Sequence, residues 1–181
     1  MPAARHRNSA RPLMAVHRGN VRLRGLAARD HALHAAHLLR LTAQDRRARF
    51  NTALSDDAIL AYSRNLDWRH VWVFGAFVDG TLRGLAELIP DKQGKEAELS
   101  VSVERAYQHA GIGKLLSLAM VLIARRTGIG TIHIFHVPGN LGMRALARDL
   151  GATTIVEPGL LEGVVSLRAG PTPHLGEARM R

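Results

Sequence analysis

A short glycine-containing loop between a strand and a helix is the feature that most restricts the fold of this chain. Residues 96–103 alternate between apolar and polar side chains, which is the pattern of a half-buried strand. Apolar residues recur at helical spacing from Gly113 onward, and Gly128 marks the end of that helix. The loop between them contains Gly111 and Gly113. A strand, a glycine loop and a helix in this order predict a site where backbone N–H groups at a helix N-terminus hold an anion.

The spacing of the loop excludes two familiar phosphate motifs. A Walker A loop requires Gly at position 108 and Ser or Thr at position 115, but the chain has Gln108 and Leu115 there. A dinucleotide-binding loop requires a third glycine where the chain has Leu116. The remaining pattern is Gln-x-x-Gly-x-Gly, read at Gln108, Gly111 and Gly113. For the loop taken alone, a turn without a ligand stays an equal alternative.

The rest of the chain alternates between strand and helix patterns. Two β-rich runs flank Asp79-Gly80, a dipeptide that predicts a hairpin. The predicted order is a strand, two helices, three antiparallel strands, a helix, a strand, a helix and two strands. We expect these elements at residues 21–26, 29–40, 55–65, 71–78, 82–89, 96–103, 113–128, 131–137, 140–150, 153–156 and 164–167. The fold class is therefore α+β, with a mixed, mostly antiparallel sheet flanked by helices.

Length and charge restrict the domain organisation. A chain of 181 residues with a net charge of +10 is long enough for one core, which we place at 21–168. Residues 1–20 carry four arginines and no acidic side chain, and we predict disordered tails at 1–20 and 169–181. A nucleic-acid-binding arm is the alternative, but the N-terminal tail lacks interleaved aromatic residues, so nucleic acid is not the expected partner.

The composition of the chain argues against several classes of protein and of binding site. It has no cysteine, so disulfides and thiolate ligands are excluded, and it has no apolar run long enough to span a bilayer. Because the N-terminus lacks the apolar segment of a secretory signal, we expect a cytoplasmic protein without a membrane partner. His31, His34 and His37 share a helical spacing, but no carboxylate motif completes a metal shell, so we predict solvated histidines and no metal. His133 and His136 fall on opposite faces of a strand.

The Gln-x-x-Gly-x-Gly pattern resembles the acyl-CoA pyrophosphate loop of the GNAT (GCN5-related N-acetyltransferase) superfamily. The order of elements over residues 21–168 is similar to its fold, and the segments 97–103, 124–129 and 140–151 match it in sequence. Arg49-Phe50, among other residues, further resembles the catalytic domain of bacterial Pat-type protein-lysine acetyltransferases.

The resemblance implies that the chain binds acetyl-CoA. The pyrophosphate would lie on the backbone amides of residues 109–114, and the pantetheine arm would lie along residues 101–103. Asn140 would contact the cofactor arm, with a plain helix N-cap as its alternative role. The implied cofactor-binding residues are Val101, Ser102, Val103, Gln108, His109, Ala110, Gly111, Ile112, Gly113, Lys114, Asn140 and Met143.

The resemblance also implies transfer of the acyl group to a primary amine, a protein lysine included. Glu98 is the predicted general base, because it lies on the polar side of the strand at a position that is acidic in many relatives; a cross-strand salt bridge is its alternative role. Glu87 and Glu96 are weaker candidates. Ala147 stands where many relatives have a tyrosine acid, which favours a CoA-binding protein without turnover as one alternative. The other alternative is an acetyltransferase for small-molecule amines. The oligomeric state stays open, and a homodimer is one of the possibilities.

Overall fold

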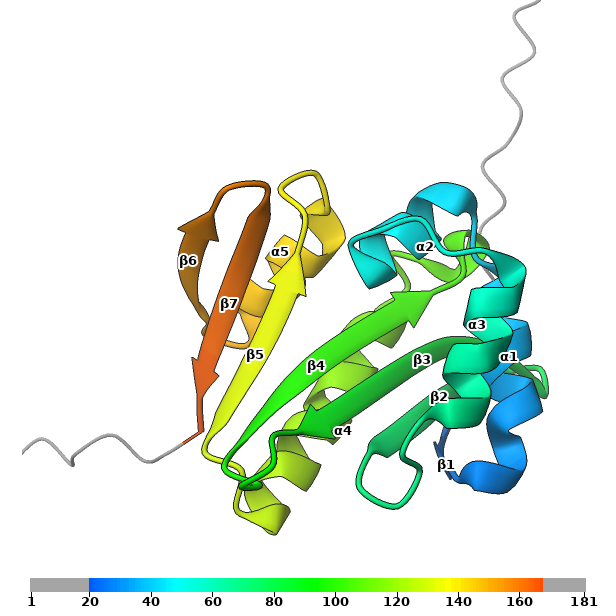
Figure 1. Ribbon diagram of the computed structural model, residues 1–181, viewed down its shortest axis with the longest axis horizontal. Helices are drawn as coiled ribbons and strands as arrows, with labels where there is room; N and C mark the ends of the chain where they lie inside the picture. The colour runs from blue at the N-terminus through cyan, green and yellow to red at the C-terminus, as the bar shows by residue number, and fades with distance from the viewer. Residues whose placement is uncertain (1–19, 168–181) are drawn as a thin grey trace, which may run out of the picture.

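The computed structural model describes residues 20–167, so the tails predicted at 1–20 and 169–181 lie outside the described residues apart from Asn20. Within that range the chain forms one seven-stranded sheet with helices on both faces (Figure 1). The elements are β1 (Val21–Leu26), η1 (Ala28–Asp30), α1 (His31–Arg40), α2 (Ala43–Phe50), α3 (Asp56–Asn65), β2 (Trp72–Val78), β3 (Thr81–Pro90), β4 (Glu96–Val103), η2 (Arg105–Tyr107), α4 (Ile112–Thr127), β5 (Thr131–His136), α5 (Leu141–Asp149), β6 (Thr153–Glu157) and β7 (Leu160–Ser166).

The sheet has the order β1-β2-β3-β4-β5-β7-β6. Every neighbouring pair is antiparallel except β4 and β5, which are parallel. The predicted α+β class with a mostly antiparallel mixed sheet is therefore confirmed. The predicted hairpin is present as well: Asp79 and Gly80 have φ angles of 48° and 78°, as a two-residue turn between twisted strands requires.

Two apolar cores lie on the two faces of the sheet. On one face α4 and α5 pack against the central strands, and this larger core includes Leu99, Leu116, Met120 and Ile134. On the other face α1 and α3 cover β2 and β3, with Leu38, Ile59 and Leu85 at the centre. Figure 1 shows α4 and α5 behind the sheet and α1 to α3 in front of its β1-to-β4 half. The front of β5, β7 and β6 has no helix over it in this view.

Helix α2 is an α-helix that the sequence pattern did not predict. Helix α2 has eight residues, none of them buried, so it lacks the apolar periodicity by which helices are recognised. Its ends are nevertheless well defined: the Thr42 side chain accepts a hydrogen bond from the N–H of Asp45, and Asn51 ends the helix with a φ of 56°. The last strand also begins earlier than predicted, at Leu160, directly after a tight turn at Pro158-Gly159.

The prediction of solvated histidines on α1 was wrong for two of the three. His31 is exposed, but His34 and His37 have no exposed surface. They tolerate burial because each ring has a hydrogen-bonding partner: His34 Nδ1 lies 2.9 Å from Ser63 Oγ, and His37 Nε2 lies 2.9 Å from Ser102 Oγ. The expected alternation on β5 holds, since His136 is buried and His133 is on the opposite face.

Candidate functional site

The two parallel strands at the centre of the sheet diverge from each other. β4 and β5 pair only through residues 96–98 and 131–133, although β4 continues to Val103. The side of β4 that faces β5 therefore has unpaired backbone groups from Leu99 to Val103. A cavity of about 720 Å³ opens at this split, which is within the usual size of a ligand pocket. Its walls come from α2, the end of β4, the glycine loop, the start of α4, and the segment that leads into α5.

The glycine loop presents a row of free N–H groups to this cavity. No N–H from His109 to Lys114 donates a hydrogen bond to another of the described residues 20–167. His109 and Gly111 have positive φ angles of 63° and 82°, so the backbone alternates in handedness before α4 begins. Such a backbone forms a concave anion site at the positive end of a helix dipole. The loop therefore fits a phosphate group without any rearrangement of its hydrogen bonds.

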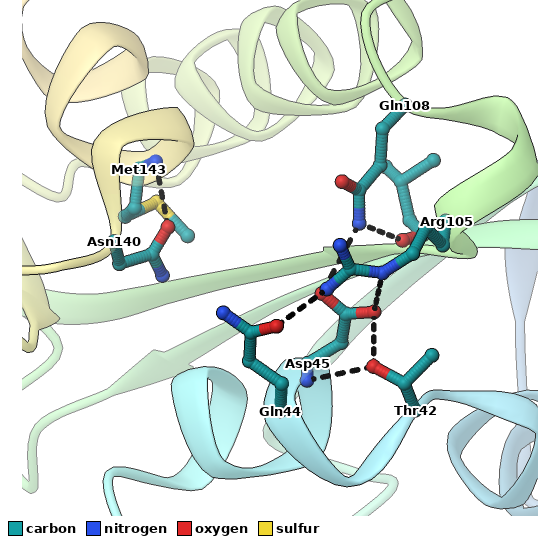
Figure 2. Close-up of polar contacts among 8 residues, drawn as sticks. Thr42, Gln44, Asp45, Arg105, Gln108, Asn140 and Met143 are labelled. Carbon is teal, nitrogen blue, oxygen red and sulfur yellow. Dashed lines mark hydrogen bonds and ion pairs between the residues drawn. The ribbon is translucent and has the colours of Figure 1, made fainter.

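The side chain of Gln108 connects the loop to the end of β4 and to α2. Its amide Nε2 donates to the carbonyl oxygen of Val103 at 3.0 Å and to Asp45 Oδ1 at 3.4 Å (Figure 2). Arg105 forms a second link, because its Nε and Nη2 atoms lie 3.2 and 3.0 Å from the two carboxylate oxygens of Asp45. Asp45 belongs to α2, so these contacts fix α2 against the loop and close one side of the cavity.

Asn140 lies across the cavity from this link (Figure 2). Its side-chain oxygen accepts a hydrogen bond from the N–H of Met143 at 3.1 Å, so Asn140 caps α5, and it lines the cavity as well. Ala147 is buried, and a Cβ built on Gly163 would lie only 3.1 Å from its own Cβ. Residue 147 therefore packs against β7 and supplies no proton donor.

The structure brings together nearly all of the predicted cofactor-binding residues. Every one of them lines the cavity except Ala110. Two of them have other partners: the Gln108 amide is engaged with Val103 and Asp45, and Ser102 Oγ lies beside His37. The sequence prediction missed the α2 wall, which is formed by Gln44, Asp45, Arg47, Ala48 and Arg49. The polar composition of this segment gave no signal for its position.

The three candidate bases have different environments. Glu98 is exposed at the base of the β4–β5 split, outside the cavity lining, and has no ion pair or hydrogen bond with the other described residues. Glu96 instead lies 2.9 Å from His133 Nε2. Glu87 has no exposed surface and lies 2.7 Å from the guanidinium of Arg49. The salt bridge considered for Glu98 is thus made by its neighbour Glu96.

A sequence model of the acetyltransferase (GNAT) family matches residues 35–152, a span that includes both sides of the cavity. The chain belongs to this family. The predicted superfamily and enzyme class, an acetyltransferase that uses acetyl-CoA as acyl donor, are thereby confirmed.

Solved structures agree with this family in fold. The GNAT domain of S. lividans PAT is 20% identical, with 81% of this chain and 90% of that chain covered and a TM-score of 0.70. The yncA protein of Salmonella typhimurium, solved with acetyl-CoA, is 21% identical, with 87% and 99% covered and a TM-score of 0.67. The ribosomal-protein-S18-alanine N-acetyltransferase of Escherichia coli is 16% identical, with 84% and 97% covered and a TM-score of 0.65. At these identities, the likeness concerns the fold.

This acetyltransferase also contains a buried ionic network that the sequence did not reveal. Burial alone would raise the pKa of Glu87, but the charge of Arg49 and a hydrogen bond with His34 hold it at about 2. The Tyr62 hydroxyl donates to the second carboxylate oxygen. Glu87 is therefore a buried anion with three polar partners, and its low pKa makes it a poor base. Arg49 also lines the cavity, so its ion pair with Glu87 connects the cavity wall to the buried network.

No helix within residues 20–167 is long and apolar enough to cross a bilayer. The same residues contain no group of three or more histidine and acidic side chains that could hold a metal ion.

Proposed function

We propose that this acetyltransferase transfers the acetyl group to the side-chain amine of a protein lysine, with Glu98 as the general base. The observation that carries the proposal is the divergence of β4 and β5. It places free loop amides at one end of the exposed β4 backbone and a free carboxylate at the other. The donor and the acceptor can therefore meet at the split from opposite faces of the sheet.

The fit of acetyl-CoA rests on the chain's own groups. The free amides of residues 109–114 would hold the pyrophosphate, and the unpaired β4 backbone near residues 101–103 would bind the pantetheine amides as an added strand. Bound acetyl-CoA supplies the thioester, whose carbonyl carbon accepts the amine. A backbone N–H of β4 directed at that carbonyl would stabilise the negative charge that develops on its oxygen.

Glu98 would remove the proton that the amine must lose. A lysine amine with a pKa of about 10.4 is neutral in about one molecule in a thousand at pH 7.4, which costs about 4 kcal/mol. In the transfer, the neutral amine nitrogen forms the new C–N bond, and the C–S bond breaks with its electron pair leaving on sulfur as the CoA thiolate. The proton lost from nitrogen passes to the Glu98 carboxylate directly or through one water. The carboxylate can accept it because no lysine, arginine or histidine among the described residues is paired with it.

The test measures thiol release with acetyl-CoA and a panel of lysine peptides and small amines. We expect Glu98→Gln to lower turnover by about 10²- to 10⁴-fold. The acetyl-CoA-induced rise in melting temperature should stay unchanged. Asp57→Asn, which neutralises an exposed carboxylate on α3, is the matched control and should keep full turnover.

Two results would contradict the proposal in different ways. Near-normal turnover of Glu98→Gln across the pH range would remove Glu98 from the role of base. Acetylation of small amines with no transfer to any peptide would exclude a protein lysine as the acceptor.

A further inference from the structure

Within residues 20–167, no helix covers one face of the outer part of the sheet. The residues of β5 alternate, with Ile132, Ile134 and His136 buried towards α4 and α5. The register carries this alternation across β7 and β6, so every second residue of these strands faces the other way. Figure 1 shows this face of β5, β7 and β6 open towards the viewer, beside the layer formed by α1 to α3.

We call this surface the acidic face and define it by its charged residues. The carboxylates on it are those of Glu96, Glu98, Glu157 and Glu162. His133 is its only basic side chain among the described residues, because no lysine or arginine occupies an outward position of these strand segments. This is unusual in a chain that has 25 lysines and arginines against 15 acidic residues. The acidic face therefore has a charge opposite to that of the whole chain.

The histidine holds two of these carboxylates in place. His133 Nδ1 lies 2.5 Å from Glu162 and His133 Nε2 lies 2.9 Å from Glu96. The Glu96 side chain is 54% exposed, so it stays accessible to a ligand. The Phe135 ring stacks beside His133 with their centroids 6.3 Å apart. The face thus combines paired carboxylates with apolar side chains such as Phe135 and Ile155, directly beside Glu98, which pairs with His133 in the strand register.

We propose that the acidic face binds the peptide segment that contains the acceptor lysine, and that it selects segments with a second lysine or arginine two to four residues away. This inference rests on the proposed function. Glu98 and Glu162 lie on strands that are two places apart in the sheet, and the register offsets them by two residues along the strands, so their backbone positions are about 12 Å apart. An extended peptide covers about 3.3 Å per residue, so about three to four residues separate two side chains that reach these carboxylates. Opposite charges at this spacing match an extended basic segment.

The experiment compares three short peptides that contain one lysine in a neutral sequence. The first has arginine three residues from the lysine, the second has glutamine there, and the third has glutamate. KM for each peptide is measured with saturating acetyl-CoA, and binding to the CoA-loaded protein is measured separately by fluorescence anisotropy. We expect KM to be lowest for the arginine peptide, by about 3- to 30-fold relative to the glutamine peptide, and the difference to shrink as salt is added.

The variant Glu96→Gln/Glu162→Gln tests the surface itself. It should remove the preference for the arginine peptide while leaving the KM for acetyl-CoA unchanged. The control Asp57→Asn/Asp79→Asn removes the same net charge at exposed positions on α3 and in the β2–β3 turn, so it should keep the preference. If the double variant does not fold, the single substitutions Glu96→Gln and Glu157→Gln alter exposed side chains and serve instead.

The outcomes separate this inference from the proposed function. Turnover of peptides with no dependence on their charge, or a preference that survives Glu96→Gln/Glu162→Gln, would overturn the inference alone. Charge-dependent peptide binding without turnover would support the acidic face and contradict the proposed function. Tighter peptide binding only after deletion of residues 1–19 would mean that the chain's own basic segment is the occupant, which also overturns the inference.

Discussion

Replacement of Gly111 by aspartate tests whether the glycine loop holds an anion. Gly111 has a φ of 82°, and a Cβ built on it has no heavy atom within 4 Å. A side chain there meets no steric obstacle, and the backbone cost of a left-handed residue is about 1–2 kcal/mol. Gly80 is a close match, with a φ of 78° and nothing within 4 Å, but it lies in the β2–β3 turn. Gly80→Asp therefore reproduces the strain and the charge change away from the cavity.

The expected magnitude follows from Coulomb's law. A carboxylate on residue 111 would come within about 6 Å of an anion that is held by the amides of residues 109–114. Each phosphate charge would then be repelled by about 0.7 kcal/mol at the dielectric constant of water and by about 3 kcal/mol at an effective value of 20. These energies correspond to about 3- to 100-fold weaker binding of acetyl-CoA.

The assay is the shift in melting temperature on addition of acetyl-CoA at about 100 times the dissociation constant of the unmodified protein. That concentration stabilises the folded state by about 2.7 kcal/mol, and a 30-fold weaker site leaves about 0.9 kcal/mol. For a chain of this size, the shift should fall from about 5–11 °C to about 2–4 °C. Gly80→Asp should keep the full shift.

A neutral side chain of the same shape distinguishes charge repulsion from a steric cause of the weaker acetyl-CoA binding. Gly111→Asn has nearly the same shape as Gly111→Asp and tolerates a positive φ equally well, but it carries no charge. The reasoning is refuted if Gly111→Asp keeps the full shift, or if Gly111→Asn loses as much of it as Gly111→Asp does.

Two further predictions concern the contacts around the cavity. Asp45→Asn removes the ion pair that fixes α2 to Arg105, so the KM values for acetyl-CoA and acceptor should rise by about 3- to 10-fold. The free energy of unfolding measured in urea should fall by less than about 1 kcal/mol. The control Asp56→Asn removes another ion pair of α2 and should leave both KM values unchanged. Glu87→Gln leaves the Arg49 guanidinium buried without a counter-charge and should lower the free energy of unfolding by about 3–5 kcal/mol. In the unmodified protein the pKa of Glu87 is depressed to about 2, so its contribution is complete above the ordinary glutamate pKa of about 4.3 and is lost as the pH falls towards 2. Urea unfolding at several pH values checks this sign, and a stability that is constant between pH 5 and pH 2 would contradict it.

The parts of the site that could be predicted from sequence are those formed by one continuous segment. The strand ending at Val103, the loop and α4 are adjacent in the chain, so their side-chain periodicity and two glycines determine their local conformation. The hairpin at Asp79-Gly80 is local for the same reason. Such segments form much of the cavity wall, and this is why nearly all of the predicted cofactor-binding residues line the cavity.

The α2 side of the cavity depends on contacts between residues that are far apart in the chain. Glu87 meets Arg49 from α2 and His34 from α1, and periodicity shows which side of an element a residue faces but not which element covers it. For this reason His34 was predicted to be solvated and is buried.

By itself, the sequence determined the α+β class, the glycine loop with its helix, and the position of Glu98 on the polar side of its strand. Only the tertiary structure decided that β4 separates from β5 beyond Glu98, that α2 closes the cavity, and that four strands combine into an acidic face around His133. The physical reason is that local conformation depends on neighbouring residues, whereas burial, ion pairing and the shape of a cavity depend on the packing of distant ones.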